Sequence, residues 1–181
     1  MSSTNSPLRI HGVETAEGGI IGMTLCPGKI GRGRRCYWRR DLAADLAVIA
    51  DWGAERIITL MEDHELLTFQ VSDIGYRTER HLGPDAWLHL PIVDMDIPDQ
   101  RFEQGWSDCR KGIHQVLERG GRILVHCLGG LGRTGTVAAR ILVETGVMPN
   151  DAIHRVRSAR PGAIERETQA HYVDGLLDPS G

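Results

Sequence analysis

Cys127 and Arg133 are the two residues of this chain whose types and spacing point most clearly to chemistry. Five residues separate them, and three of these are glycines, namely Gly129, Gly130 and Gly132. Glycines let successive backbone N–H groups turn toward one point, which forms a concave nest for an anion. A helix is expected to begin near Arg133, and the positive end of its dipole adds to the same site. The segment therefore predicts a cradle for a tetrahedral oxyanion, on which the planar guanidinium of Arg133 closes.

Cys127 would lie at the bottom of this cradle. N–H dipoles, a helix N-terminus and a guanidinium all favour the thiolate over the thiol, and a thiolate that faces a bound phosphate is a nucleophile aimed at phosphorus. The hydroxyl of Thr134 can donate to the sulfur and support its later departure. His126 is expected to be buried and bonded to the loop backbone rather than to act as an acid or base. A core cysteine before an ordinary turn would explain Cys127 alone, and a nucleotide-binding Walker loop needs a Gly-Lys-Ser/Thr ending that this loop lacks.

Attack by a thiolate expels an alkoxide or phenoxide, and a carboxylic acid nearby can protonate it. The segment Pro91–Asp99 follows a predicted strand and offers Asp94, Asp96 and Asp99. Asp94 comes first after the strand and is therefore expected nearest to the cradle, with Asp96 next and Asp99 last. Asp99 follows Pro98 and could instead cap the next helix. The same acid can serve as the base that activates water in a second step.

The elements that must position these residues alternate along the chain. Apolar runs predict strands at 20–25, 56–61, 87–93 and 122–126, and helical spacing of apolar residues predicts helices at 41–52, 62–69, 99–118, 134–145, 150–157 and 166–177. This alternation predicts an α/β fold with a mostly parallel central sheet flanked by helices on both faces. Ligands of such sheets bind beyond the carboxyl ends of the strands, where the loop and the acids are expected.

Composition limits the classes of protein that this chain can represent. The 181 residues suit one domain, and 41% hydrophobic with 25% charged residues is a globular balance. A net charge of -3 disfavours a nucleic-acid partner, and no apolar run is long enough to span a membrane. No secretory signal is visible, so a cytoplasmic location is expected. We expect a partly flexible N-terminal segment at 1–19, a single domain at 20–177 and a short tail at 178–181.

Neither a metal nor another cofactor is expected. The 8 histidines form no HxH or HxxxH pair, and the 4 cysteines form no CxxC pair. Cys26 and Cys36 are candidates for a disulfide with Cys127 on oxidation.

Each of two charged clusters can be interpreted in two ways, as part of a functional site or as an ordinary structural feature. Five arginines lie within residues 32–40 and could dock an acidic or phosphorylated substrate. A solvated loop and a first helical turn explain them more simply. The acids of Glu62–Glu65 follow the second strand and could border the site, although acids at a helix N-terminus are the simpler explanation.

The segment from His126 to Gly135 resembles the HCxxGxGR[ST] active-site signature of the cysteine-dependent protein tyrosine and dual-specificity phosphatases. The loop is most similar to that of the kinase-associated phosphatase branch, the cyclin-dependent kinase inhibitor 3-like proteins. Leu25–Gly28, Pro91–Asp99 and Gly162–Gln169 also resemble segments of that branch, in the same order. The resemblance covers roughly residues 20–177, and the strand–loop–helix context expected of the motif is present. Low-molecular-weight phosphatases and arsenate reductases share the Cys-x5-Arg spacing, but theirs lies near the N-terminus.

The resemblance implies a protein tyrosine phosphatase-like fold and catalysis without a metal. Its acid loop matches Asp94 through the pattern Pro-Ile-x-Asp. Gln169 resembles a residue that positions water in some relatives, and a polar position at the start of the last helix explains it equally well.

Together these observations predict a phosphomonoesterase that works through a cysteinyl-phosphate. Cys127 attacks, Asp94 protonates the leaving group and Thr134 assists the thiolate. The phosphate is expected to bind Leu128, Gly129, Gly130, Leu131, Gly132 and Arg133. A phosphorylated protein is the preferred substrate. Phosphoinositides are the alternative, disfavoured because the loop lacks lysine. An adaptor without turnover would be expected to lack the cysteine, the arginine or the acid, and all three are present.

Overall fold

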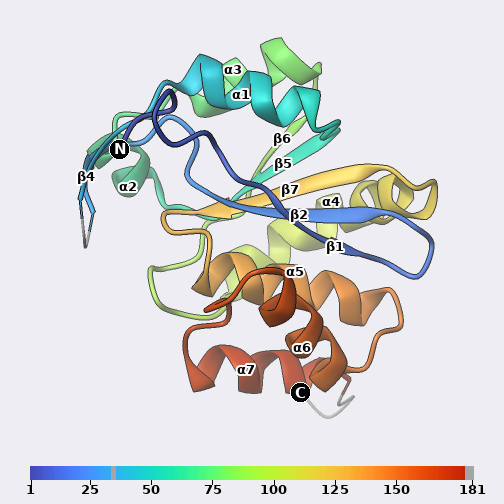
Figure 1. Ribbon diagram of the computed structural model, residues 1–181. Helices are drawn as coiled ribbons and strands as arrows, with labels where there is room; N and C mark the ends of the chain where they lie inside the picture. The colour runs from blue at the N-terminus through green and yellow to red at the C-terminus, as the bar shows by residue number, and fades with distance from the viewer. Residues whose placement is uncertain (34–35, 178–181) are drawn as a thin grey trace.

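The computed structural model describes residues 1–33 and 36–177, and its centre is a five-stranded sheet (Figure 1). The strand order is β1-β2-β7-β5-β6. The strands span His11–Glu14 (β1), Ile20–Leu25 (β2), Arg56–Thr59 (β5), Trp87–His89 (β6) and Arg122–Cys127 (β7). β1 pairs antiparallel with β2, and the other neighbours pair in parallel. The predicted α/β fold with a mostly parallel sheet is therefore confirmed.

Helices cover both faces of this sheet (Figure 1). One face carries α1 (Leu42–Asp51), α2 (Asp63–Thr68) and α3 (Ile74–Leu82), and the other carries α4 (Gln100–Glu118), α5 (Gly132–Glu144), α6 (Pro149–Ala159) and α7 (Glu167–Asp174). A short 3-10 turn, Gly175–Leu177, follows α7. Each face has its own apolar core, as the two sides of a doubly covered sheet require.

Caps and apolar spacing explain where the flanking helices begin. Asp41 accepts a hydrogen bond from the N–H of Ala44, and α1 starts at the next residue. Asp99 does the same for α4, accepting from the N–H groups of Arg101 and Phe102. The capping role that the sequence allowed for Asp99 is thus the one it has in the fold.

Three parts of the fold carry too weak a signal to be predicted. Helix α3 buries Ile74, Gly75 and Thr78, so its inner face is hardly apolar. Strand β1, within the expected N-terminal segment 1–19, buries only Val13 and forms an edge of the sheet. The third is a hairpin of β3 (Ile30–Arg32) and β4 (Tyr37–Arg39), outside the main sheet. Residues 34–35 and the expected tail 178–181 lie outside the described residues.

The parallel register places the ends of four strands at one edge. Leu25 of β2 pairs with Cys127 of β7, while Thr59 of β5 pairs with His126 of β7 and with His89 of β6. The segments that follow β2, β5 and β6 therefore surround the end of β7. This edge is the one at which the sequence predicted chemistry.

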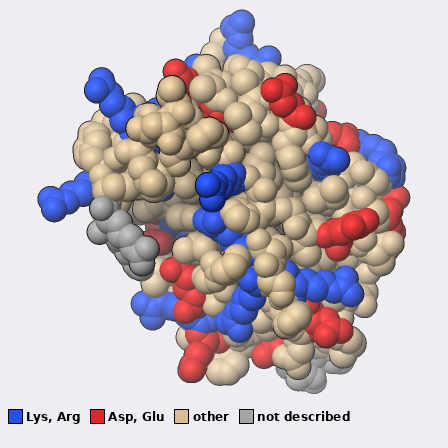
Figure 2. All heavy atoms as spheres, in the orientation of Figure 1, with Lys and Arg blue, Asp and Glu red and all other residues tan. Residues whose placement is uncertain are grey.

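Neither a bilayer span nor a metal cluster is found in the residues that the structure describes. No helix there is long and apolar enough to cross a membrane. No group of three or more His, Cys, Asp or Glu side chains there could hold a metal ion. Positive and negative side chains are interspersed over the face shown in Figure 2.

Helix α5 should contribute strongly to stability because nearly all of its residues are buried. Ile141 on this helix is 0% exposed, so Ile141→Ala should lower the free energy of unfolding by about 2–5 kcal/mol. Leu67 on α2 is 73% exposed, and Leu67→Ala should change the free energy of unfolding by no more than about 0.5 kcal/mol. Urea unfolding of both variants checks this, and equal losses would show that α5 does not form the core described.

Candidate active site

The loop between β7 and α5 places Cys127 and Arg133 as the sequence predicted. β7 ends at Cys127, which is 4% exposed, and α5 begins at Gly132. Gly130 adopts a φ of 68°, and a Cβ there would lie 2.3 Å from the carbonyl oxygen of Thr24. Only glycine satisfies both constraints, so this position fixes the close approach of the loop to β2.

The backbone of this loop turns its carbonyl groups toward cationic side chains. Arg160, just after α6, donates from Nε to the carbonyl of Gly130 at 3.2 Å and from Nη2 to the carbonyl of Gly129 at 3.3 Å. Within residues 1–33 and 36–177, no acceptor is found for the N–H groups of Gly129, Gly130 and Leu131. These backbone N–H groups are therefore free, within the described residues, to donate hydrogen bonds to an oxyanion.

One N–H of the loop region is occupied by a carboxylate. Glu165 accepts from the N–H of Gly132 at 3.0 Å, at the N-terminus of α5. The preceding residue, Ile164, has a φ of 56°, which is a strained conformation for a β-branched residue. Arg157 donates to the carbonyl of Ile164 at 3.0 Å, and the N–H of Ile164 donates to the carbonyl of Leu131 at 3.4 Å. These contacts, one from α6 and one to the loop, hold Ile164 in its strained conformation, as is common at functional sites.

Arg133 is the most tightly held charge at this edge of the sheet. Its guanidinium is 1% exposed and forms a two-point ion pair with Glu65 at 2.6 and 2.8 Å. Nη1 also donates to the carbonyl of Ile92 at 3.0 Å, and Nη2 contacts Asp94 Oδ1 at 2.9 Å. Among the described residues, its Nε–H has no acceptor. One edge of the fork therefore combines a free N–H with a contact to an exposed carboxylate.

The ion pair with Glu65 keeps both groups charged. Burial alone would raise the pKa of Glu65, but the hydrogen bonds from Arg133 and from the N–H of Glu62 hold this pKa below its ordinary value. Burial would likewise lower the pKa of Arg133, but Glu65, together with Cys127 and Asp94, raises it. The sequence left two interpretations of the acids at 62–65, a border of the site and a helix N-terminus, and preferred the second. Glu65 does border the site, as its position after β5 allowed, but its contact with Arg133 was not predicted.

The three candidate acids have different partners. Asp94 contacts Arg133, and its side chain is 58% exposed. Asp96 accepts from the N–H of Ile97 at 2.9 Å within its own loop, and Asp99 caps α4. Only Asp94 among the three is bonded to the loop arginine.

Thr134 and His126 are both fully buried beside the loop. The Thr134 hydroxyl has no hydrogen-bond partner in the described part of the chain, so the expected bond to the cysteine sulfur is not formed here. Nε2 of His126 lies 2.8 Å from Oγ1 of Thr59, so a side chain of β5 holds one side of the ring. Burial lowers the pKa of His126 to about 3, which keeps the ring neutral.

Gln169 lies against the loop, and both ends of its amide form hydrogen bonds. A Cβ at Gly132 would be 3.0 Å from Nε2 of Gln169. This amide donates to the carbonyl of Asp96 at 3.2 Å and accepts from the N–H of Arg166 at 3.3 Å. In this structure Gln169 ties the acid-bearing loop to α7.

The remaining candidates lie around the β2 end of the site. All four cysteines are free, and burial raises the pKa of Cys26 to about 12. Of the arginines at 32–40, Arg40 is buried against Asp45 at 2.6 Å, whereas Arg32 and Arg39 are exposed. The other two, at 34–35, lie outside the described residues.

Comparison of the sequence with known proteins finds a matching family and several related phosphatases. Residues 32–147 match the family described as "Polymorphic toxin system, DSP-PTPase phosphatase". The rat protein cyclin-dependent kinase inhibitor 3 is 27% identical over 148 residues, which cover 77% of this chain and 65% of that protein. Human dual specificity protein phosphatase 15 is 27% identical over 110 residues, which cover 60% of this chain and 33% of that protein. The chain thus spans about a third of the length of one relative and less than two thirds of the other.

Solved structures agree on the fold. The crystal structure of kinase associated phosphatase, with serine in place of its catalytic-site cysteine, superposes with a TM-score of 0.80 at 24% identity and covers 96% of both chains. A phosphatase structure titled Tk-PTP in the active form superposes with a TM-score of 0.64 at 25% identity and covers 92% of this chain and 95% of that chain. The resemblance to the kinase-associated phosphatase branch is therefore confirmed. Because the family match spans well over half of this chain, the chain belongs to the DSP-PTPase phosphatase family.

Proposed function

We propose that this chain hydrolyses phosphomonoesters of phosphorylated proteins through a covalent phosphocysteine at Cys127. The observation that carries this proposal is the 2.9 Å contact between Arg133 and Asp94. It brings an acid from the loop after β6 to the arginine that follows the cysteine loop. The three groups that the reaction needs therefore lie at one edge of the sheet.

The phosphoryl group would enter between the loop N–H groups and the free edge of Arg133. A planar fork binds phosphate best through two parallel N–H groups, and Nε–H with Nη2–H forms that edge. Since Nη2 now contacts Asp94, a bound phosphate dianion would take over this contact and release the Asp94 carboxyl. The released group, 58% exposed at the mouth of the site, can then meet the leaving oxygen.

In the first step the Cys127 thiolate attacks phosphorus, the bond from phosphorus to the ester oxygen breaks, and Asp94 gives its proton to that oxygen. In the second step water attacks phosphorus, Asp94 accepts a proton from this water, and the S–P bond breaks. Phosphate leaves and the thiolate is restored. The buried hydroxyl of Thr134, which has no hydrogen-bond partner among the described residues, is available to donate to the departing sulfur.

Glycines and leucines line the loop, and it carries no lysine that would suit a polyphosphorylated head group. This favours a phosphorylated side chain over a phosphoinositide as substrate. Because the nucleophile must stay a reduced thiol, we propose that the protein works in the cytoplasm.

Turnover of phenyl phosphate in the presence of EDTA tests the residue assignments. Cys127→Ser should abolish turnover. Asp94→Asn should lower kcat by about 10²–10⁴-fold and remove the dependence on a protonated acid from the pH profile. Asp96→Asn is the matched control in the same loop and should stay close to wild type. A large loss in Asp96→Asn with an unaffected Asp94→Asn would assign the acid to Asp96. Comparing phosphotyrosine peptide, phosphothreonine peptide and phosphoinositide then tests the substrate class.

Glu65 should be needed to hold Arg133 in place. Removing one partner of a buried ion pair leaves the other charge uncompensated, so Glu65→Gln should lower the free energy of unfolding by about 3–5 kcal/mol at pH 7. The pKa of Glu65 is lower in the folded than in the unfolded protein, so its contribution is present above about pH 4.3 and is lost as the pH falls through the folded value.

The difference between wild type and Glu65→Gln in urea unfolding should therefore shrink on acidification. Glu79→Gln, at an exposed position of α3, is the control and should change stability little. A difference that grows as the pH falls would contradict this account of the ion pair.

A further inference from the structure

Lys29 is a buried cation beside the loop, and neither the family motif nor the proposed reaction gives it a role. It follows the Cys26–Gly28 turn at the end of β2 and is 4% exposed. Its Nζ donates to the carbonyl of Leu128 at 2.9 Å, directly after the nucleophile, and lies 4.2 Å from the ring centre of Trp38. No carboxylate forms an ion pair with Lys29 in the part of the chain that the structure describes.

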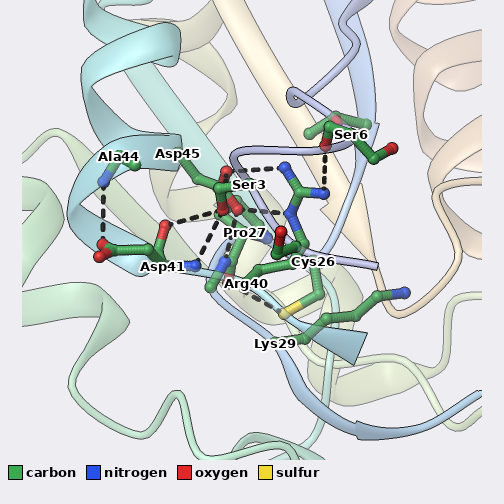
Figure 3. Close-up of polar contacts among 12 residues, drawn as sticks. Ser3, Ser6, Cys26, Pro27, Lys29, Arg40, Asp41, Ala44 and Asp45 are labelled. Carbon is green, nitrogen blue, oxygen red and sulfur yellow. Dashed lines mark hydrogen bonds and ion pairs between the residues drawn. The ribbon is translucent and has the colours of Figure 1, made fainter. Parts of the chain in front are cut away.

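A separate buried network fixes the backbone that presents this lysine (Figure 3). Asp45 on α1 accepts from the N–H of Gly28 at 2.9 Å, and it pairs with Arg40 at 2.6 and 2.7 Å. The N–H of Arg40 in turn donates to the carbonyl of Lys29 at 3.1 Å. Gly28 has a φ of 70°, and a Cβ there would lie 2.5 Å from Leu42. These contacts therefore restrict the turn before Lys29 to one conformation.

The contact with Leu128 has a direct consequence for the loop. The C=O and N–H of one planar trans peptide point in opposite directions. When Lys29 holds the Leu128 carbonyl outward, the N–H of Gly129 is turned toward the inside of the loop. Arg160 has the same effect on the next two peptides through the carbonyls of Gly129 and Gly130. The backbone N–H of Cys26 donates to the same Leu128 carbonyl at 3.4 Å, and Lys29 adds the shorter contact of 2.9 Å. Lys29 and Arg160, on different elements, thus help to orient three successive N–H groups.

Charge supports the same assignment. A buried ammonium without a carboxylate partner is costly unless another anion compensates it. Burial lowers the pKa of Lys29, and the nearby sulfurs of Cys26 and Cys127 oppose this effect. In the proposed reaction, the Cys127 thiolate or an oxyanion bound above it would compensate the charge of Lys29.

We infer that Lys29 is a positioning residue of the phosphate loop, which fixes the Leu128 peptide so that the Gly129 N–H faces a bound phosphoryl group and which adds positive charge behind Cys127. This inference rests on the proposed function. It differs from a purely structural role, in which Lys29 would only attach the β3–β4 hairpin to the sheet.

The test compares Lys29→Met with Lys29→Arg, and it uses the chain's other lysine, the exposed Lys111 on α4, as the control Lys111→Met. The inhibition constant for vanadate, kcat and KM for phenyl phosphate, and urea unfolding are measured for each. Lys29→Met should weaken vanadate binding and lower kcat/KM by about 10–10²-fold, the scale of a misplaced loop. Lys29→Arg should recover part of both, and Lys111→Met should match wild type.

A Lys29→Met protein that is less stable but keeps wild-type vanadate affinity and kcat/KM would overturn the inference and leave Lys29 a structural tether. If Lys29→Met does not fold, Lys29→Gln takes its place with the same expectation. Wild type that binds vanadate without turnover would refute the proposed hydrolysis, and the role of Lys29 would then be decided by vanadate affinity alone. Wild type that binds no oxyanion would overturn both.

Discussion

The guanidinium of Arg133 is the constraint on which the rest of the site depends. A guanidinium that is 1% exposed is tolerated because most of its N–H groups meet an acceptor or an anion. Glu65 supplies two carboxylate oxygens, the strand extensions after β5 and β6 supply carbonyls, and Asp94 meets the outer edge. The ion pair therefore joins three loops that follow three different strands. The Nε–H, which has no acceptor among the described residues, is the donor available to the oxyanion of the proposed reaction.

The loop around Cys127 is held by contacts in which the charges are reversed. At Arg133 carbonyls and carboxylates surround a cation, whereas Lys29 and Arg160 place cations on loop carbonyls. The free N–H groups then lie on the side away from these cations. Strand register makes this arrangement possible, since Leu25 of β2 pairs with Cys127 and Thr59 of β5 pairs with His126, so that β2 and β5 flank the strand end that bears the cysteine. Segments distant in sequence meet because parallel strands end together, so the sheet itself sets the geometry of the site.

The sequence was sufficient for the features that are local or periodic. The alternation of strands and helices predicts the parallel sheet, and a cysteine, glycines and an arginine at a helix start predict the anion cradle. It was not sufficient for contacts between segments distant in sequence. The ion pair of Glu65 with Arg133 and the contact of Lys29 with Leu128 arise from tertiary structure, and no sequence spacing predicts either contact. Helix α3 and the β3–β4 hairpin were missed because they bury few apolar side chains. The choice of Asp94 was predicted from its place after a strand, and the structure adds its contact with Arg133.

The central claim is that Cys127 carries the phosphoryl group during turnover. Rapid quenching and denaturation of the wild-type protein during phenyl phosphate turnover, followed by peptide mass spectrometry, tests it most directly. The account predicts a phosphoryl group on the cysteine of the peptide that contains Cys127, and none in Cys127→Ser. A phosphoryl group on another residue, or turnover that persists in Cys127→Ser, would contradict it.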